Sequence, residues 1–322
     1  MARQELLAWW WSRLLEIAPN VFFVTGKNQS RFPYCACLYV AGREKRVLID
    51  AGMGASRLAP VIEKGIDLLL LTHCHIDHRL TRRNITQVPV GCHALEAPYM
   101  SDKDRFMEEA GFARSGLDLS WTYERDPRLF EVDVAFTLAD GERIDLGGLT
   151  LEAVLTPGHS PGHLSFFIRE HRLLFSGDVD LTPFGPFYGH DFADIDDFAA
   201  SIDRLKAMDA QIVVTGHSYP VTEDIPRRFD RFAGVVRTRE HALQKFIEKP
   251  CSLDELIGRG IIYRKFHDDT PYGALTRWFE RVHIEKHLKR LAAAGRASID
   301  PDTGHWFLLA KQTLKMKTAF KT

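Results

Sequence analysis

The chain has 322 residues, of which 45% are hydrophobic, 26% are charged and 11% are aromatic. This composition is ordinary for a globular protein, and it excludes a disordered chain, a collagen-like fibre and a small disulfide scaffold. The 42 basic and 43 acidic residues nearly cancel, so the whole chain carries no bias toward a polyanion or a membrane surface. The length predicts two domains, or one domain with a large appendage.

The N-terminal segment has no targeting or membrane-spanning pattern. It lacks the basic start and the cleavage site of a signal peptide, and Arg13 and Glu16 interrupt its apolar run. We therefore expect a cytoplasmic protein with no stable membrane insertion. Glu5–Ile17 has the spacing of an amphipathic helix, but the consecutive Trp9–Trp11 cannot all lie on one face. A homodimer contact through an exposed tryptophan is an alternative to simple packing.

Short apolar runs dominate the first two thirds of the chain and predict strands. Helical spacing separates them at Ala55–Lys64 and Asp194–Met208. This mixture predicts an α/β protein with two sheets, or one folded sheet, and helices outside. The predicted strands are Val21–Thr25, Cys35–Val40, Arg46–Ile49, Ile66–Thr72, Val132–Thr137, Leu149–Leu155, Leu164–Ile168, Arg172–Ser176 and Ile212–Val214.

The pattern becomes mostly helical after this point, which predicts a first domain at 1–220 and a second at 221–322. A long helix is predicted at Arg227–Glu248, and Ser252 with Glu255 has the spacing of a capping box for a short helix. Another helix runs from Pro271 to Ala294. A hairpin follows, with strands at Arg296–Ile299 and His305–Leu309. This order of elements predicts a winged-helix-like domain.

Charge divides at the same boundary. Residues 221–322 hold 20 basic and 13 acidic residues, whereas the rest of the chain holds 22 and 30. The basic excess suits a polyanion such as nucleic acid, although exposed helices are commonly basic. The candidate phosphate contacts are Lys286, Lys289, Arg290, Arg296, Lys311, Lys315, Lys317 and Lys321.

A cluster of residues that commonly bind metals follows the apolar run Leu68–Leu71. His73 and His75 are two positions apart, so an extended backbone points both imidazoles to the same side. Asp77 and His78 come where the chain can turn into a helix and aim a second pair at a neighbouring point. Four such side chains in six positions can therefore serve two adjacent metals.

The HxHxDH sequence at His73–His78 resembles the signature of the metallo-β-lactamase-fold hydrolases. Four further segments resemble other motifs of that family, and they are Leu48–Gly52, Thr156–His163, Phe175–Asp178 and Thr215–His217. The resemblance spans roughly residues 20–220. It implies an α/β fold of the αββα sandwich type. With the C-terminal winged-helix-like domain, it points to the glyoxalase II-like, winged-helix-bearing subgroup.

The resemblance also implies a role for each ligand. The first metal would be held by His73, His75 and His159, the second by Asp77, His78 and His217, and Asp178 would bridge them. We expect two divalent ions, Zn²⁺ in the first place, with Fe and Mn as alternatives that accept the same ligands. A hydroxide bridging the metals would attack the substrate, and Asp77 or Asp178 would take part in proton transfer.

Other residues are expected around the metals. Asp50 could accept a hydrogen bond from a ligand histidine, with helix capping as the alternative. Arg79 could hold an anionic group of the substrate or form a salt bridge at the surface. Three aromatic residues could line the pocket or belong to a packed loop, and they are Phe184, Phe187 and Tyr188.

Two histidines compete for the role in the third motif. In the family the first histidine of such a doublet is the ligand, so His163 is expected to be structural. Cys74 lies between two ligands and should point the opposite way, as a small buried residue. The remaining histidines, including His190, have no spacing that indicates a role.

Asp178 also narrows the reaction. Exported β-lactamases of this fold generally have Cys or Ser at this position, so antibiotic hydrolysis is not expected. The favoured function is hydrolysis of an ester or thioester of a small-molecule substrate by a dinuclear metal centre. The alternative is a metal-dependent phosphodiesterase or endoribonuclease on single-stranded RNA, with the basic C-terminal domain as its binding platform.

Overall fold

The computed structural model describes residues 14–119, 127–266, 268 and 270–309. The chain divides into two compact units, Met1–Val236 and Arg237–Thr322. The division falls within helix α8 (Ile225–Phe246), after the change to helical sequence. The assignment of residues 1–220 as a catalytic domain stays a prediction.

The first unit contains a seven-stranded sheet whose strands are neighbours in chain order. β1 to β4 pair antiparallel, and β4 to β7 pair parallel. Helix α2 (Ala55–Lys64) makes the crossover that the parallel pair β4–β5 requires. The strands are β1 (Leu15–Ala18), β2 (Val21–Val24), β3 (Cys37–Ala41), β4 (Arg46–Ile49), β5 (Leu68–Leu70), β6 (Val90–His93) and β7 (Phe136–Leu138).

A second, five-stranded sheet has the order β12-β11-β10-β9-β8. β11 and β12 are parallel, and the other neighbours are antiparallel. Helix α7 (Ile195–Ala207) connects β11 to β12, and it begins where the Asp194 carboxylate accepts hydrogen bonds from two backbone N–H groups. The strands are β8 (Arg143–Asp145), β9 (Thr150–Leu155), β10 (Leu164–Ile168), β11 (Leu173–Phe175) and β12 (Ile212–Val214).

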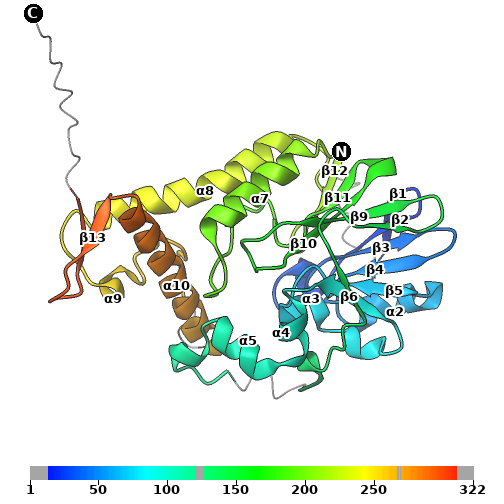
Figure 1. Cartoon of the computed structure of the whole chain (residues 1–322), viewed down its shortest axis with the longest axis horizontal. Helices are drawn as coiled ribbons and strands as arrows, with labels where there is room; N and C mark the ends of the chain where they lie inside the picture. The colour runs from blue at the N-terminus through cyan, green and yellow to red at the C-terminus, as the bar shows by residue number, and fades with distance from the viewer. Residues whose placement is uncertain (1–13, 120–126, 267, 269, 310–322) are drawn as a thin grey trace, which may run out of the picture. The chain divides into compact units, whose positions relative to one another are not determined.

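The two sheets pack face to face. One hydrophobic cluster joins Val40 and Ile49 of the first sheet with Phe166 and Leu173 of the second. A second cluster joins the outer face of the second sheet to α7 and to the part of α8 that belongs to the first unit. Helices therefore cover both outer faces (Figure 1). This layer order confirms the predicted αββα sandwich.

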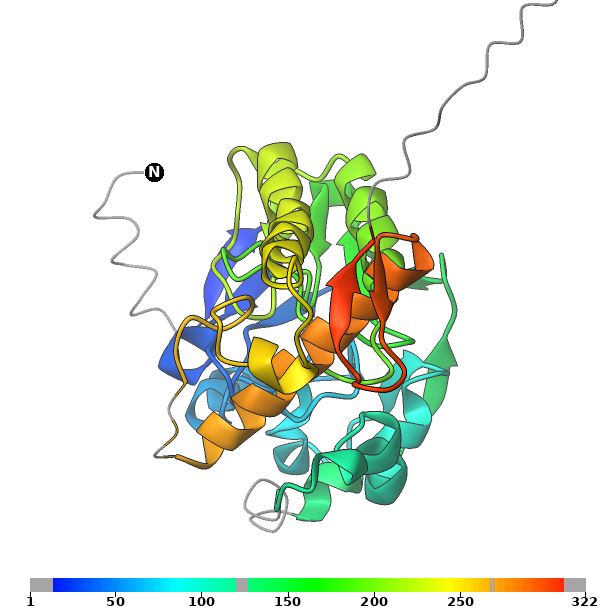
Figure 2. The ribbon, with the colours of Figure 1, turned by 90° about the vertical axis from the view of Figure 1, so that its left-hand side faces the viewer.

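The second unit is mainly helical. It contains the end of α8, the single turn α9 (Leu253–Leu256) and α10 (Pro271–Ala293). The predicted capping box of Ser252 and Glu255 begins α9. The hairpin of β13 (Ala297–Ile299) and β14 (Trp306–Leu308) follows, and β13 packs on α10 (Figure 2). A helical C-terminal domain is thus confirmed, and its classification as a winged helix stays a prediction.

Several elements differ from the predictions. The spacing predicts a helix over residues 15–17, but they belong to β1, which pairs with β2 with a register shift between Glu16 and Ala18. The remainder of that helix, with Trp9–Trp11, lies outside the described residues. β8 was not predicted, because its side chains are mostly exposed and supply no apolar run. The helices α4 (Ala97–Ser101) and α5 (Lys103–Glu109) were not predicted either.

Across the described residues, no helix combines the length and the apolar character that a membrane span needs.

Candidate metal centre

The predicted ligands follow the ends of strands in both sheets. His73 and His75 come after β5, and Asp178 and His217 come after β11 and β12. His159 lies in the loop from β9 to β10. Because β5 continues the parallel part of its sheet and β11 pairs parallel with β12, the carboxyl ends of these strands bring distant segments to one place.

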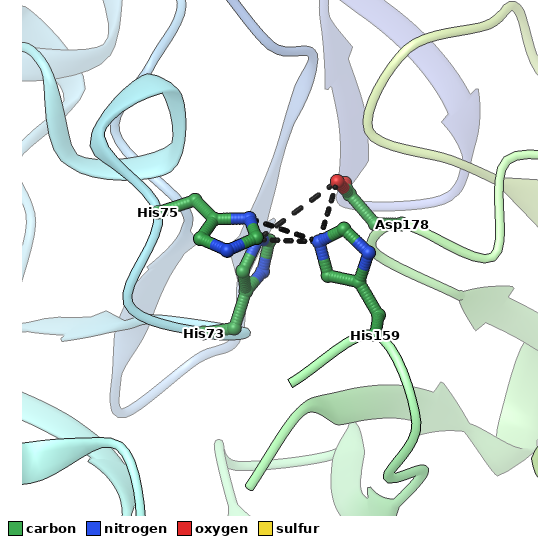
Figure 3. Close-up of side chains that lie close together, drawn as sticks. All are labelled: His73, His75, His159 and Asp178. Carbon is green, nitrogen blue, oxygen red and sulfur yellow. Dashed lines mark hydrogen bonds and ion pairs between the residues drawn. The ribbon is translucent and has the colours of Figure 1, made fainter. Parts of the chain in front are cut away.

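The first group of ligands consists of His73, His75, His159 and Asp178, all of them buried (Figure 3). Nε2 of His159 lies 3.2 Å from Nε2 of His73 and 2.9 Å from Nδ1 of His75. The same Nε2 atom lies 3.1 Å from Oδ2 of Asp178. Three imidazole nitrogens and one carboxylate oxygen thus converge on one point, where they could hold a metal ion.

The second group consists of Asp77, His78 and His217. The one-turn helix α3 (Ile76–Arg79) carries the first two. Oδ2 of Asp77 lies 3.2 Å from Nε2 of His217 and 3.9 Å from Nε2 of His78. This turn of helix places its two side chains in a second group with His217, while the ring of His78 stays 4.2 Å from that of His73.

The carboxylate of Asp178 lies between the two groups. Its Oδ2 atom faces the first group, at 3.1 Å from Nε2 of His159. Its Oδ1 atom faces the second group, at 2.9 Å from Nε2 of His78 and 3.6 Å from Nε2 of His217. One side chain therefore offers one oxygen to each group.

Two buried atoms between the two groups indicate whether these residues fit metal ions. Nε2 of His78 and Oδ1 of Asp178 have no hydrogen-bond partner within the described part of the chain, although they lie 2.9 Å apart. A cation between the two atoms would be bound by both of them. Imidazole and carboxylate donors are those that Zn²⁺, Fe and Mn accept. The residues therefore fit divalent metal ions.

The remote ring nitrogens fix the tautomers of three ligand histidines. Nδ1 of His159 donates to the backbone oxygen of Phe187 at 2.9 Å, and Nδ1 of His217 donates to that of Ser30 at 2.7 Å. Nδ1 of His78 lies 2.7 Å from a carboxylate oxygen of Asp50. Because these oxygens only accept, each Nδ1 carries a proton, and Nε2 is the atom that would bind a cation once the ring is neutral.

The histidines of the cluster differ in the direction of their pKa shifts without metal. Burial, together with neighbouring imidazoles, holds the pKa of His73 and of His75 well below the usual value. Burial acts in the same direction on His217, but the carboxylates of Asp178 and Asp180 outweigh it and raise its pKa to about 10. The pKa of His78 is likewise raised, against burial, by Asp178 and Asp50. The second group therefore holds protons at neutral pH that a metal must displace.

Comparison with known proteins gives the family. Residues 31–217 match the sequence profile described as the metallo-beta-lactamase superfamily. The chain belongs to the metallo-beta-lactamase superfamily. It is a hydrolase of that superfamily with a cluster of residues that could hold metal ions. The narrower assignment to a glyoxalase II-like subgroup stays a prediction.

Several superfamily proteins resemble this chain over most of its length. The "Beta-lactamase-like protein 2 homolog" of Caenorhabditis elegans is 26% identical over 88% of this chain and 84% of its own. The "Atrochrysone carboxyl ACP thioesterase" of Claviceps purpurea is 25% identical over 91% of this chain and 87% of its own. The crystal structure of a metallo-beta-lactamase family protein from Thermus thermophilus has a TM-score of 0.73 and 22% identity. It covers 91% of this chain and is itself covered completely.

Arg79 is buried and does not point outward to the surface, whereas its predicted contact with an anionic group of the substrate stays a prediction. Its side chain is buried, and the guanidinium donates to the backbone oxygens of Met100 at 2.9 Å and Tyr99 at 3.3 Å. It also lies over the ring of Phe130, at 4.6 Å from the centroid. The residue therefore supports the end of α4.

The three predicted aromatic residues differ in burial, and the predicted role of Phe184 and Phe187 in a pocket stays a prediction. Tyr188 is fully buried in the cluster on the outer face of the second sheet, so it is part of a packed loop. The half-buried ring of Phe187 lies 5.8 Å from that of His159. Phe184 is half-buried. His163 lies behind Asp178, whose backbone N–H donates to its Nε2 at 3.1 Å.

Three polar residues near the ligands were not singled out from the sequence. His190 is buried, and its ring lies 4.4 Å from that of His75. Asp180 accepts a hydrogen bond from the backbone N–H of His217. Glu96 is fully buried beside two ligand loops. Of these, only Asp180 could have been found from the sequence, because it stands two positions after the predicted ligand Asp178.

Proposed function

We propose that this chain is a dinuclear metal-dependent hydrolase that cleaves an acyl thioester or a related ester of a small molecule. The observation that carries the proposal is the position of Asp178, with one oxygen toward each ligand group. Two ions, for which we propose Zn²⁺, would supply a hydroxide nucleophile at neutral pH and polarise the scissile carbonyl.

The side chains around the ligands prepare the site for this reaction. The acceptors on the remote nitrogens of His78, His159 and His217 hold the rings in the tautomer that binds a cation. Burial raises the pKa of Asp77 and Asp178, but the imidazoles of His78 and His217 outweigh it and lower both values below the usual carboxyl range. Both carboxylates are therefore ionised at neutral pH, and either can accept a proton during the reaction.

Two observations favour a thioester over a phosphodiester. The Claviceps purpurea relative, which aligns over most of both chains, is named as a thioesterase. A phosphodiester also needs cationic contacts, and Arg79, the arginine next to the ligands, is buried against backbone carbonyl groups. A thioester carbonyl is neutral and needs no such contact.

The basic C-terminal residues add little support for nucleic acid. Arg290 pairs with the carboxylate of Glu240, and Nη1 of Arg296 lies 3.9 Å from it. Four of the other candidates, Lys311, Lys315, Lys317 and Lys321, lie outside the described residues. An endoribonuclease therefore remains the alternative outcome of the experiment below and is not a second proposal.

The experiment compares two substrates with the metal-loaded full chain. The probes are an S-acyl-N-acetylcysteamine thioester and bis(4-nitrophenyl) phosphate. We expect turnover of the thioester by the wild type and by His241→Ala, an exposed control histidine. The variants His78→Ala and Asp178→Ala should lose it. Turnover of the phosphodiester alone would overturn the substrate class, and full activity of metal-loaded His78→Ala would overturn the dinuclear centre.

A further inference from the structure

We propose that Glu96 is a positioning residue, whose buried carboxylate fixes the distance between the two loops that carry the first group of ligands. This inference rests on the metal centre proposed above. It gives a role in positioning the ligands to a residue that lies outside every sequence motif. Glu96 stands just before α4 and is fully buried. It is no candidate ligand itself, because each of its oxygens already accepts hydrogen bonds from the protein.

The contacts of Glu96 reach both loops. Oε2 accepts a hydrogen bond of 2.8 Å from the backbone N–H of Cys74, which stands between His73 and His75. Oε1 accepts from the hydroxyl of Ser160 and from the backbone N–H of Gly162, both at 2.7 Å. Ser160 directly follows His159 in the chain. One side chain therefore joins the loop after β5, in the first sheet, to the loop before β10, in the second.

The close approach of the second loop depends on a glycine. A Cβ atom at Gly162 would lie 3.0 Å from Cγ of Glu96 and 2.7 Å from Nδ1 of His93. Such distances are shorter than nearly all contacts that Cβ atoms make in proteins, so a side chain at this position would push the loop away from Glu96. The geometry thus requires both the carboxylate and the absence of a side chain opposite it.

The donors around Glu96 require a carboxylate. Cys74 and Gly162 present backbone N–H groups, which cannot reverse their direction. A carboxylate can accept at both oxygens, whereas a glutamine amide has one oxygen and one NH₂ group. In Glu96→Gln the NH₂ group must face one of the two backbone donors, so one of the loops loses its anchor.

The effect should be selective for the first group. None of the hydrogen bonds of Glu96 described above reaches the segment of Asp77 and His78 or the loop of His217. His78 is instead held by Asp50. Changes to hydrogen-bonded partners of metal ligands typically lower metal affinity about 10–100-fold. We therefore expect a loss of about this size for one of the two ions.

The experiment measures Zn²⁺ stoichiometry and affinity by equilibrium dialysis, and the absorption bands of the Co²⁺-loaded full chain. The wild type should bind two ions. Glu96→Gln should bind the first-group ion about 10–100-fold more weakly and lose part of the Co²⁺ spectrum. Adding His217→Ala should remove the remaining tight ion, whereas adding His75→Ala should not.

The matched control is Glu280→Gln in the second unit. Glu280 is also fully buried, and it also accepts from two backbone N–H groups, those of Gly258 and Ile262. This variant should lower the thermal midpoint and leave metal binding unchanged. If Glu96→Gln does not fold, Gly162→Ala displaces the same loop and should give the same selective loss.

The inference would be overturned if Glu96→Gln bound both ions with wild-type affinity and had an unchanged Co²⁺ spectrum. The same result in Gly162→Ala, used in its place, would also overturn it. Failure of the proposed function would look different. It would be visible in the wild type itself, as binding of a single ion or as absence of thioester turnover, and it would not depend on Glu96.

Discussion

The carboxylate of Asp50 lies 2.7 Å from Nδ1 of His78, and both side chains are fully buried. Asp50 also accepts a hydrogen bond of 2.9 Å from the backbone N–H of Thr72. The hydroxyl of Thr72 in turn lies 2.9 Å from Nδ1 of His73. One carboxylate therefore supports a ligand of the second group directly and a ligand of the first group through a threonine.

This relationship predicts that Asp50→Asn weakens metal binding by about 10–100-fold, mainly at the second group. Asparagine keeps the shape and tolerates the left-handed backbone of this residue, where φ is 62°. Its single oxygen, however, cannot serve both His78 and Thr72. Calorimetric titration with Zn²⁺ measures the loss. Asp67→Asn, which alters a partly exposed carboxylate paired with Arg46, should bind like the wild type. Equal affinities in the two variants would contradict the prediction.

The sequence singles out the candidate ligands because several of them form a local pattern. His73 to His78 lie within six positions after an apolar run, and such a pattern is visible without any tertiary contact. The same holds for β4, β10 and β12, whose apolar runs match the observed strands residue for residue. Short segments with one periodic face, bounded by turn residues, carry their own signal.

The residues that hydrogen-bond to the ligand loops form no local pattern in the sequence. Glu96 lies 22 positions from Cys74 and 64 from Ser160, so only the fold brings them together. In the sequence it resembles any surface glutamate. Arg79 is the opposite case, because its place beside His78 in the sequence suggests a position at the metals. Its side chain leaves the one-turn helix α3 in another direction, toward the carbonyl groups of α4.

A second prediction concerns protons released when metal binds. The pKa of His217 is raised to about 10 without metal, so its ring is protonated at pH 8. Its ring must lose a proton before Nε2 can bind a cation, so metal binding must release a proton, and the affinity of the second group should rise as the pH approaches 10. His73 and His75, whose pKa values are lowered, should release none.

Calorimetric titrations at pH 8 in two buffers with different ionisation enthalpies measure this release. At saturation with metal, the wild type should release more protons per chain than His217→Ala. The variant His171→Ala, altered at a histidine that contacts the backbone oxygen of Pro19, serves as the control and should match the wild type. Equal proton release by the wild type and His217→Ala would show that His217 is neutral before metal binds.

A third prediction separates the structural role of Arg79 from substrate recognition. Arg79→Met keeps the length and apolar stem of the side chain but leaves the backbone oxygens of Tyr99 and Met100 without these donors. We expect the free energy of unfolding to fall by about 1–3 kcal/mol in urea titrations, because buried acceptors become unsatisfied. Arg105→Met, altered at an exposed ion pair with Glu109, should change the free energy of unfolding by less than about 0.5 kcal/mol.

The KM for the acyl thioester should stay unchanged in both variants. Unchanged stability of Arg79→Met together with a raised KM would instead assign Arg79 to the substrate, because only a side chain that contacts the bound molecule alters its affinity without altering the fold.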